Sequence, residues 1–546
     1  MHTDISGWKT RLTDKMIERY TRDGTWPDST LAERAMRRLD HQPRTDDARE
    51  GDLESTFGAL MTTARRLADA LAKMGLQPGD VISFQLPNWL ETMSINLAAC
   101  LGGYICNPIV PIYRDAEVGF ILADARAKVF FIPEKYRNIN YIEMTRRLRP
   151  QLPDLKEVVV LRGNPHECQA FESLLASGDG EDIQTAPPDP NAIKLLSYTS
   201  GTTGKPKGVL HSHNTIMAEL EAVIRYWQMT QNDVILMASP VTHLTGYLYA
   251  LELPFLTGAK IVLMDRWNAS EAVDLIVAHG GTMSVGATPF LAELVAEAER
   301  RKITLPSMRM FACGGAPVAP EIIRRAHLVL PNSIVSRVFG STEAPTVTLG
   351  VNARAEQELG ALTDGRIVNH EVLIVDPSGA PVPEGDSGEI VTRGPEVMLG
   401  YTDWLETERA FDRDGYFHTG DAGFISHRAF ITISGRIKDL IIRGGENLSP
   451  KDIEDALHRH PAIRDVAVVA MPHERLGETP CAFVELKDGQ ALDLDGLREF
   501  LENVRIARQK FPEKLIVVDR LPRTASGKIQ KQELRARVQA LLAARR

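Results

Sequence analysis

The chain has 546 residues, of which 43% are hydrophobic and 25% are charged, and its formal net charge is −9 at pH 7. This length exceeds what one hydrophobic core supports and predicts a large domain joined to smaller ones. The acidic balance argues against nucleic acid as a partner. The longest apolar region, residues 244–264, is interrupted by Glu252, Pro254 and Lys260, so the sequence predicts no membrane span.

The five cysteines form no CxxC pair and no spacing typical of a disulfide framework. The first residues carry no apolar core of the kind that a secretory signal peptide needs. We therefore expect buried thiols in a reducing compartment, which indicates a cytoplasmic protein.

Helical and strand patterns alternate along the first part of the chain. Thr56 precedes an amphipathic helix whose apolar residues recur at three- and four-residue steps up to Met74, and Gly75 suits its end. Further patterns predict helices near residues 31–39, 89–102 and 116–125, and strands at residues 81–86, 105–110, 129–132 and 158–161. This alternation predicts a parallel sheet with helices on both faces.

An acidic connector with prolines, residues 178–190, leads into the most informative stretch. Residues 195–209 read Leu-Leu-Ser-Tyr-Thr-Ser-Gly-Thr-Thr-Gly-Lys-Pro-Lys-Gly-Val. A strand is expected up to Tyr198, and the following glycines, hydroxyls and lysines suit the oxygens and charge of a polyphosphate. A solvated linker is the alternative, whereas the P-loop of NTPases does not fit because Pro206 follows Gly204-Lys205. The predicted phosphate loop comprises Thr199, Ser200, Gly201, Thr202, Thr203, Gly204 and Lys205.

Later strand patterns end in small or polar residues. Residues 234–243 end in Pro-Val-Thr-His, and residues 308–317 end in Cys-Gly-Gly-Ala-Pro. Parallel sheets hold ligands at the carboxyl ends of their strands, so both ends are expected at one binding edge. A lone histidine there is more often structural than catalytic, and we expect His243 to line a pocket rather than to transfer protons.

The pattern changes after residue 370. Short strands with Pro, Gly and Asp turns between residues 373 and 398 predict a separate β subdomain. Beyond it, helices at 451–459 and 494–503 and strands at 466–470, 481–486 and 514–518 predict a small α+β domain. This domain ends in residues 521–528, Leu-Pro-Arg-Thr-Ala-Ser-Gly-Lys.

Five segments together resemble the acyl-adenylate-forming superfamily, which includes acyl-CoA synthetases, standalone adenylation domains and luciferases. They are the predicted phosphate loop, residues 337–344 (Arg-Val-Phe-Gly-Ser-Thr-Glu-Ala), residues 416–421 (Tyr-Phe-His-Thr-Gly-Asp), residues 435–447 and residues 521–528. They occur in the family's order and span nearly the whole chain. The chain resembles medium-chain or cyclohexanecarboxylate-CoA ligases within the acyl-CoA synthetase branch.

The resemblance implies a nucleotide site made of the phosphate loop with Gly315, Ala316, Phe339, Gly340, Asp421 and Arg436. Gly315 and Ala316 border the adenine, and Phe339 offers it a ring face without the hydroxyl of the commoner Tyr. Asp421 accepts from the ribose hydroxyls, for which a carboxylate is chemically suited. Arg436 contacts ribose or phosphate.

The resemblance also implies a catalytic set of Lys528, Thr342, Glu343 and His243. Thr342 donates to the α-phosphate or the substrate carboxylate, and Glu343 holds Mg²⁺, which takes few protein ligands. Lys528 lies between the substrate carboxylate and the α-phosphate, and His243 lines and gates the acyl site. Without the resemblance, Glu343 and Lys528 would be interpreted as surface residues.

The implied fold is an α/β amino-terminal domain of parallel-type sheets with a β subdomain, followed by a small mobile α+β domain. The implied bounds are 1–435, with the β subdomain at about 360–435, a hinge at 436–440 that contains Lys438, and 441–546. After rotation about the hinge, Gly444 and Gly445 border the pantetheine tunnel.

The implied reaction uses ATP, Mg²⁺ and CoA to convert a carboxylic acid into an acyl adenylate and then an acyl-CoA. Two alternatives remain: a standalone adenylation enzyme that loads a carrier-protein phosphopantetheine, and a nucleotide-binding regulator without turnover. The sequence leaves open whether the chain forms a homodimer.

The acid itself is predicted from the lining of the acyl pocket. The expected lining is Val241, His243, Gly246, Tyr247, Gly286, Ala287, Gly315 and residues 340–348. Apart from His243 and Glu343 these residues offer no charge to pair with a second charged group, whose burial would be costly. The small residues suggest room for a bulky group, with Tyr247 as a wall. The aryl-acid branch usually has Asn where this chain has His243. We therefore expect an apolar monocarboxylic acid, of medium length or alicyclic.

Overall fold

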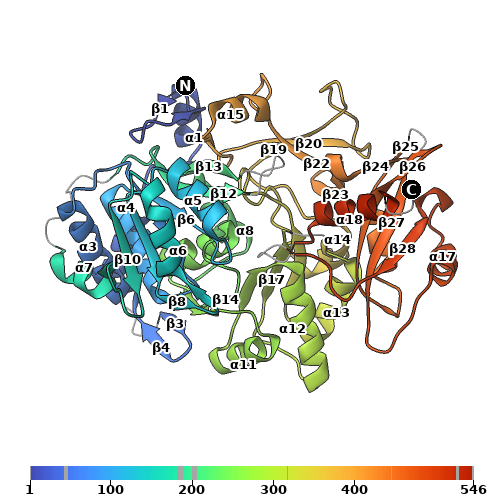
Figure 1. The fold of residues 1–546 in the computed structure, drawn as a ribbon, viewed down its shortest axis with the longest axis horizontal. Coiled ribbons are helices and arrows are strands. Elements are labelled where there is room, and N and C mark those ends of the chain that lie inside the picture. The colour runs from blue at the N-terminus through green and yellow to red at the C-terminus, as the bar shows by residue number, and fades with distance from the viewer. Residues whose placement is uncertain are drawn as a thin grey trace.

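The computed structural model describes residues 2–41, 47–180, 188–199, 206–315, 318–443, 446–523 and 528–543. These residues form two large sheets, a smaller antiparallel sheet and a carboxyl-terminal sheet, which Figure 1 shows coloured from blue to red along the chain. The predicted fold class is confirmed: a large amino-terminal α/β part is followed by a small α+β part.

The first large sheet contains the predicted amino-terminal strands. Its order is β11 (Gln169–Ala170), β10 (Glu157–Leu161), β7 (Val129–Pro133), β5 (Val81–Phe84), β6 (Ile105–Pro108), β12 (Ile193–Thr199), β13 (Lys207–Ser212) and β21 (Gly400–Tyr401). The strands from β11 to β12 are parallel, but β13 and β21 are antiparallel to their neighbours. The strands predicted to form a parallel sheet are parallel, and the sheet gains an antiparallel edge at β13 because the connection from Thr199 to Lys207 is too short for a crossover.

The second large sheet carries the strands that the sequence predicted to end at a binding edge. Its order is β18 (Ile334–Val338), β17 (Met310–Gly314), β16 (Met283–Gly286), β14 (Val234–Met237), β15 (Lys260–Leu263), β3 (Ala48–Glu50) and β4 (Leu53–Ser55). All pairs except β3 with β4 are parallel. The carboxyl ends of β14, β16, β17 and β18 consequently meet at one edge.

Helices fill the space between the sheets and cover their outer faces. They are α2 (Leu31–His41), α3 (Phe57–Lys73), α4 (Leu90–Gly102), α5 (Asp115–Asp124), α6 (Tyr141–Leu148), α7 (Phe171–Ser177), α8 (His213–Tyr226), α9 (Leu244–Gly246), the π-helix η2 (Tyr247–Glu252), α10 (Leu253–Thr257), α11 (Ala269–His279), α12 (Thr288–Arg301), α13 (Pro320–Val329) and α14 (Gln357–Leu362). The largest core lies between the sheets and includes α3, α4, α8 and η2. Helices α5 and α6 cover the far face of the first sheet, and α11, α12 and α13 cover that of the second.

Local signals set the helix ends as the sequence predicted. The Thr56 hydroxyl accepts from the Ala59 amide at 3.0 Å, which caps α3 at its first turn. Leu60 and Leu67 are among its buried residues and face the core. Gly75 follows with φ +84°, a conformation that glycine adopts readily and that ends the helix.

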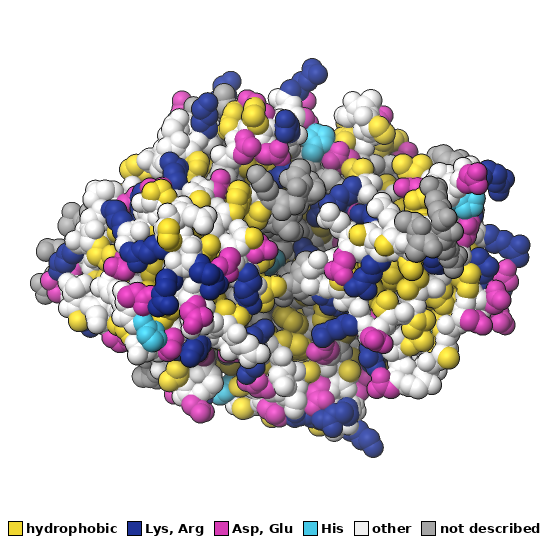
Figure 2. Space-filling model, viewed as in Figure 1, with side chains coloured by type: hydrophobic (Ala, Val, Ile, Leu, Met, Phe, Trp, Pro, Cys, Tyr) yellow, Lys and Arg dark blue, Asp and Glu magenta, His cyan; other side chains and the backbone are white. Residues whose placement is uncertain are grey.

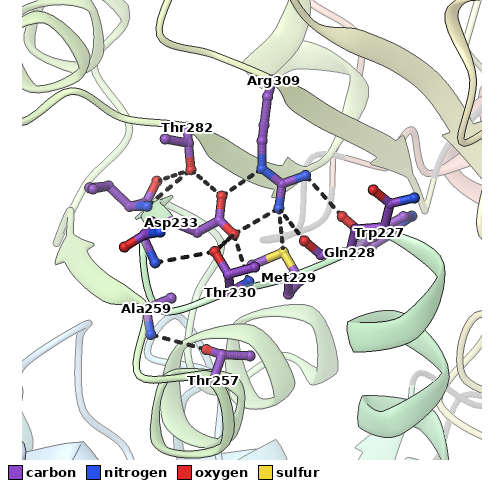
Figure 3. Close-up of polar contacts among 11 residues, drawn as sticks. Trp227, Gln228, Met229, Thr230, Asp233, Thr257, Ala259, Thr282 and Arg309 are labelled. Carbon is purple, nitrogen blue, oxygen red and sulfur yellow. Dashed lines mark hydrogen bonds and ion pairs between the residues drawn. The ribbon is translucent and has the colours of Figure 1, made fainter. Parts of the chain in front are cut away.

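A charged network holds the amino ends of the second sheet's strands together (Figure 3). Arg309 binds the buried carboxylate of Asp233 through Nε at 2.6 Å and a terminal nitrogen at 2.8 Å. Thr282 donates to the same carboxylate at 2.8 Å, and Thr230 donates its amide at 2.9 Å. The network therefore joins the segments that lead into β14, β16 and β17, at the edge opposite the carboxyl ends.

The β subdomain is an antiparallel sheet of β19 (Glu371–Val375), β20 (Gly388–Arg393), β22 (Phe417–Ser426) and β23 (Phe430–Arg436), with α15 (Trp404–Ala410) beside it. The chain's first segment, with β1 (His2–Thr3), β2 (Lys9–Thr10) and α1 (Asp14–Arg22), lies against it, as Figure 1 shows near α15. The Arg11 amide donates to the Leu399 carbonyl at 2.8 Å, and Trp26 donates to Pro395 at 2.9 Å.

The carboxyl-terminal sheet contains β25 (Glu446–Leu448), β24 (Ile441–Arg443), β27 (Gly477–Leu486), β26 (Ile463–His473) and β28 (Lys514–Val517), with α16 (Pro450–Leu457), α17 (Leu494–Asn503) and α18 (Lys531–Ala543). The short 3₁₀ helix η4 (Ile437–Asp439) connects it to β23. Buried Lys451 lies 3.6 Å from Asp364, which also lies 3.6 Å from the fully buried Arg337. One carboxylate of the large domain thus pairs with a cation from each side of the junction.

Candidate active site

The carboxyl edge of the second sheet collects most of the described site residues. Gly315 follows β17, Phe339 follows β18, and His243 lies beyond β14. The parallel register that pairs Gly314 with Val338 brings the first two segments side by side. The molecule is hollowed where its carboxyl-terminal part meets the rest, as Figure 2 shows near the centre of that view.

Lys528 reaches this edge from the carboxyl-terminal part of the chain. Gly315 has φ +78°, and a Cβ built there would lie 3.6 Å from Cε of Lys528. Burial lowers the pKa of Lys528, as does the nearby charge of Arg436, while Asp421 and Glu343 oppose the shift. The structure therefore brings Lys528, Gly315, Asp421 and Glu343 into one cluster.

Asp421 and Arg436 face each other across β22 and β23. Arg436 Nε lies 2.9 Å from an Asp421 oxygen, and a terminal nitrogen donates to the Thr419 carbonyl at 3.0 Å. Burial raises the pKa of Asp421 to about 6, although Arg436 and Lys528 oppose the shift. The carboxylate is only 6% exposed, so it suits recognition of a few hydroxyl groups rather than a role at the surface.

The turn that carries Thr342 and Glu343 is fixed at several points. Phe339 and Thr348 form a bridge at its base. A Cβ on Gly340 would lie 2.3 Å from the Thr346 amide, so only glycine fits there. The buried His211 ring donates from Nε2 to the Thr342 carbonyl at 2.7 Å. Because burial lowers the pKa of His211 to about 4, the ring is neutral at pH 7.

Glu343 is held by a tyrosine that sequence reasoning missed. The Tyr401 hydroxyl donates to Glu343 Oε1 at 3.0 Å, and the Glu343 carbonyl accepts from the Met398 amide at 2.8 Å. The Lys207 ammonium lies 5.2 Å from the centre of the Tyr401 ring and also pairs with Glu406. No periodic pattern marks Tyr401. Tyr401 lies in β21, a two-residue strand that pairs with β13, and this pairing is visible in the structure but not in the sequence.

His243 is half-buried beside this cluster. Burial lowers its pKa to about 4, and the charge of Lys528 contributes. The ring is therefore uncharged near neutral pH and cannot supply a cation to an acid. This agrees with the expectation that His243 is a pocket residue and not an acid–base catalyst, and its role in binding stays a prediction.

The predicted phosphate loop lies between two strands whose ends are held. Thr199 pairs with Lys207 in the last register position of β12 and β13. The Tyr198 hydroxyl donates to Asp124 at 2.6 Å, and Thr402 donates to the same oxygen at 2.9 Å. Several predicted site residues lie outside the described residues. In the phosphate loop they are Ser200, Gly201, Thr202, Thr203, Gly204 and Lys205, and elsewhere they are Ala316, Gly444 and Gly445.

Lys438 lies in η4 and is exposed, and the charges of Arg436 and Asp421 act on its ammonium group. Burial of its partly enclosed ammonium group lowers the pKa of Lys438. The next residue, Asp439, pairs with Arg535 of α18 at 2.5 Å. The predicted hinge therefore lies where the chain passes from β23 of the β subdomain to β24 of the carboxyl-terminal sheet.

The predicted acyl pocket differs from expectation in three ways. A Cβ on Gly286 would lie 2.8 Å from the Phe290 ring, so Phe290 already takes the space that Gly286 was expected to leave. Gly340 likewise contacts Thr346 rather than open space. Tyr247 is fully buried and its hydroxyl donates to Asn96 at 2.5 Å, so it is fixed from behind. Gly286 and Gly340 therefore do not indicate how large the bound acid is.

A buried carboxyl group that was not predicted lies behind one segment of the expected lining. Glu219 of α8 is fully buried and accepts from the Thr346 hydroxyl. Its sequence signal is an acidic residue at helical spacing with the buried apolar residues Ile216 and Val223.

The donor set fits a magnesium ion that arrives with a nucleotide. Among the described residues no group of three or more His, Cys, Asp or Glu side chains could hold a metal ion. A half-buried carboxylate, Glu343, with a hydroxyl at Thr342 matches the preference of Mg²⁺ for one or two protein ligands beside phosphate oxygens.

In the part of the chain that is described, no helix is long and apolar enough to cross a membrane.

Comparison with known proteins agrees with this arrangement. The model of the AMP-binding enzyme family matches residues 32–402, and that of the AMP-binding enzyme C-terminal domain matches residues 452–528. The chain is 36% identical to a medium-chain fatty-acid–CoA ligase of Escherichia coli (strain K12), over 94% of this chain and 92% of that protein.

Two further comparisons cover almost the whole chain. A salicylyl-CoA synthase / salicylate adenylyltransferase of a Streptomyces species is 30% identical over 95% of each chain. The crystal structure of ATP-bound MatB from Rhodopseudomonas palustris superimposes with a TM-score of 0.84 at 26% identity, over 93% of this chain and 99% of that one. The chain therefore belongs to the AMP-binding enzyme family and is an adenylate-forming acid ligase.

Proposed function

We propose that the chain is an ATP-dependent acid–CoA ligase. It forms an acyl adenylate from an apolar monocarboxylic acid, transfers the acyl group to CoA, and releases pyrophosphate and AMP. The observation that carries this proposal is the position of Lys528 over Gly315, beside Asp421 and Glu343. A lysine from the small domain at this edge is what the first half-reaction needs.

The first half-reaction brings two anions together. A carboxylate oxygen attacks the α-phosphorus of ATP, a new P–O bond forms, and the bond to pyrophosphate breaks. No proton is transferred in this step, so the protein's contribution is to position the reactants and to neutralise charge. Lys528 supplies the cation between the acid and the α-phosphate, while neutral His243 borders the acid.

Thr342 and Glu343 act on the phosphate side. Thr342 donates to the α-phosphate or the substrate carboxylate. Glu343 would hold Mg²⁺, which supplies charge neutralisation to the phosphates when it is bound. Asp421 accepts from the ribose hydroxyls, and Arg436, which is bound to Asp421 and to the Thr419 carbonyl, turns toward ribose or phosphate.

The second half-reaction requires Lys528 to withdraw. We place the hinge at residues 436–440, between domains at 1–435 and 441–546. Rotation there replaces Lys528 with the segment that contains Gly444 and Gly445, and the CoA thiolate then attacks the acyl carbon while AMP leaves. The exposure of Lys438 in a short connection between two sheets supports this assignment.

The proposed acid is medium-length or alicyclic and carries one carboxylate. The fatty-acid–CoA ligase relative supports the CoA acceptor and this acid class. The free thiols of all five cysteines support a cytoplasmic location, where ATP and CoA are available.

A standalone adenylation enzyme that loads a carrier protein is the second candidate. It is favoured by the salicylate adenylyltransferase named above. The test of both is pyrophosphate release from acetate, octanoate, cyclohexanecarboxylate, benzoate and salicylate, each with CoA or with a phosphopantetheine-bearing carrier protein. Octanoate or cyclohexanecarboxylate should lead with CoA. Preference for acetate or salicylate, or acyl transfer to the carrier alone, would overturn the proposal.

A further inference from the structure

A buried polar cluster lies behind the turn that carries Thr342 and Glu343, and the chemistry above does not use it. Oε1 of Glu219 accepts from the Tyr249 hydroxyl at 2.8 Å and from the Thr346 hydroxyl. Tyr249 belongs to η2, the helix after His243, and Thr346 belongs to the turn itself. One carboxyl oxygen therefore ties the turn to two helices of the core.

Thr346 is held in a backbone conformation that its side chain disfavours. Its φ is +33°, which a β-branched residue rarely adopts and which strains the backbone. The close contact of its amide with Gly340 leaves it little freedom. The Thr346 hydroxyl also lies 3.5 Å from that of Tyr249, so Glu219 and Tyr249 together hold Thr346 and add to the contacts that fix Glu343, three residues earlier.

The second oxygen of Glu219 points to a shared proton. Oε2 is buried and has no hydrogen-bond partner among the described residues. Glu396, also fully buried, acts electrostatically on Glu219; it accepts from Asn369 at 2.6 Å and lies 2.9 Å from His370 Nε2. Burial raises the pKa of Glu396 to about 8, and burial with the charge of Glu396 does the same for Glu219. Two such carboxyls do not ionise together near neutral pH.

The other groups around the pair do not supply a compensating charge inside the cluster. His370 is buried and its pKa is lowered to about 4, so it is neutral. Burial and the charge of Glu219 raise the pKa of Tyr249 well above its ordinary value, so it remains a hydroxyl donor. Arg225 of α8, which is largely exposed, lowers the pKa of Glu396 only from a distance. With no cation inside the cluster to balance two negative charges, one of the two carboxyls keeps its proton near neutral pH.

We propose that Glu219 is a positioning residue for adenylation: it shares one proton with Glu396 and, through Thr346 and Tyr249, fixes the turn that carries Thr342 and Glu343. The inference rests on the proposed function, which assigns those two residues to the phosphates. Loss of the proton at alkaline pH places two carboxylates side by side, and their repulsion displaces the turn.

The experiment compares Glu219→Ala, Glu219→Gln and the control Glu221→Gln. Glu221 lies on the same helix and pairs with Arg34 at 2.6 Å and with the largely exposed Arg225 at 3.7 Å, so it controls for loss of a carboxylate on α8 that does not hold Thr346. In Glu219→Ala, kcat for pyrophosphate release should fall by about a hundredfold, the effect of a small misplacement of reacting groups, while KM for ATP changes little. Glu219→Gln keeps an acceptor for Thr346 and a permanent donor toward Glu396. Its kcat should therefore not fall between pH 7 and pH 9, whereas that of the wild type and of Glu221→Gln should.

Hydrogen exchange tests the positioning role of Glu219 without relying on enzyme turnover. Amides of residues 339–348 should exchange faster in Glu219→Ala than in the wild type, and exchange in β26 and β27 should stay unchanged. Unchanged exchange in the turn, or an alkaline limb that persists in Glu219→Gln, overturns the positioning role. If no acid gives pyrophosphate with the wild type, the proposed function fails, and the exchange result alone then decides the role of Glu219.

Discussion

The side chain of Lys528 packs over the backbone of Gly315, where a Cβ would stand 3.6 Å from the lysine Cε. Gly315 adopts φ +78°, so its backbone leaves an open face beside β17. This contact is the arrangement that the proposed first half-reaction requires of Lys528. It also gives the clearest mutational test of the site.

Replacing Lys528 with Ala should slow adenylation by about a hundred- to a thousandfold, the cost of losing one transition-state donor. ATP binding and thioester formation from supplied acyl-AMP should largely survive, because Lys528 is withdrawn in the second step. Pyrophosphate release and thioester formation would be measured separately. Lys487→Ala, an exposed lysine of the same domain that donates to Pro461, is the control. An equal fall in both half-reactions of Lys528→Ala would contradict the assignment.

Replacing Lys438 with Pro should separate the two half-reactions in the opposite sense. Proline fixes φ and restricts the preceding residue, so the rotation at η4 should be impeded. Adenylation should persist while acyl transfer to CoA slows sharply in single-turnover experiments. Lys438→Ala removes the ammonium group but leaves the backbone mobile, and it should transfer at nearly the wild-type rate. If the two variants behave alike, the backbone at Lys438 is not the hinge.

Affinity for ATP should weaken in acid because of Asp421. Its pKa is raised to about 6, so the carboxylate gains a proton as the pH falls through that value and no longer accepts two ribose hydroxyls. KM for ATP should therefore rise below pH 6. Asp421→Asn should raise KM by roughly tenfold at pH 7, the cost of hydrogen bonds to a charged acceptor, and its KM should vary little with pH. An acid limb of the wild-type shape in that variant would exclude Asp421 as its source.

The network around Asp233 should matter for stability and not for catalysis. Arg309, the Thr230 amide and Thr282 lower the pKa of Asp233 below its ordinary value of 3.8, despite the opposing effect of burial. A lowered pKa contributes stability above about pH 4, and the contribution is lost as the pH falls through the folded-state value. Asp233→Asn should cost about 3 kcal/mol at pH 7, as for a broken buried pair.

The Tm values of Asp233→Asn and the wild type should converge as the pH falls below 3.8, and KM for ATP should be unchanged. Asp274→Asn breaks an exposed pair with Arg301 and should shift Tm only slightly. A constant difference in Tm across this pH range would show that the charge of Asp233 is not what stabilises the sheet.

Local patterns predicted the elements well where neighbours in sequence decide the structure. The helix after Thr56 begins with the expected cap, and the helix expected at residues 494–503 is α17 with those bounds. The fold class followed from the same alternation of periods. The reversal at β13 was not predicted, because it depends on a connection that the pattern marked only as a loop.

The family motifs singled out Asp421 and Lys528, which the structure brings into one cluster, and their roles stay predictions. The support of the site was not predictable, because the partners lie far apart in the chain. Tyr401 reaches Glu343, and Glu219 reaches Thr346, through packing of whole elements against one another. Gly286 and Gly340 were predicted to leave room for the acid, and this interpretation failed for the same reason. Their small size reflects contact with Phe290 and Thr346, which no local pattern reveals.

The first segment of the chain has a consequence for the order of folding. Trp26 finds its acceptor, the Pro395 carbonyl, 369 residues later in the sequence. At ribosomal rates of about 5–20 residues per second, some 20–70 s pass before that partner is synthesised. The indole and the neighbouring Tyr20, both buried in the finished protein, therefore stay exposed through most of translation. The segment around Trp26 is thus among the last to dock, and a nascent chain stalled before residue 395 should be the form most in need of a chaperone.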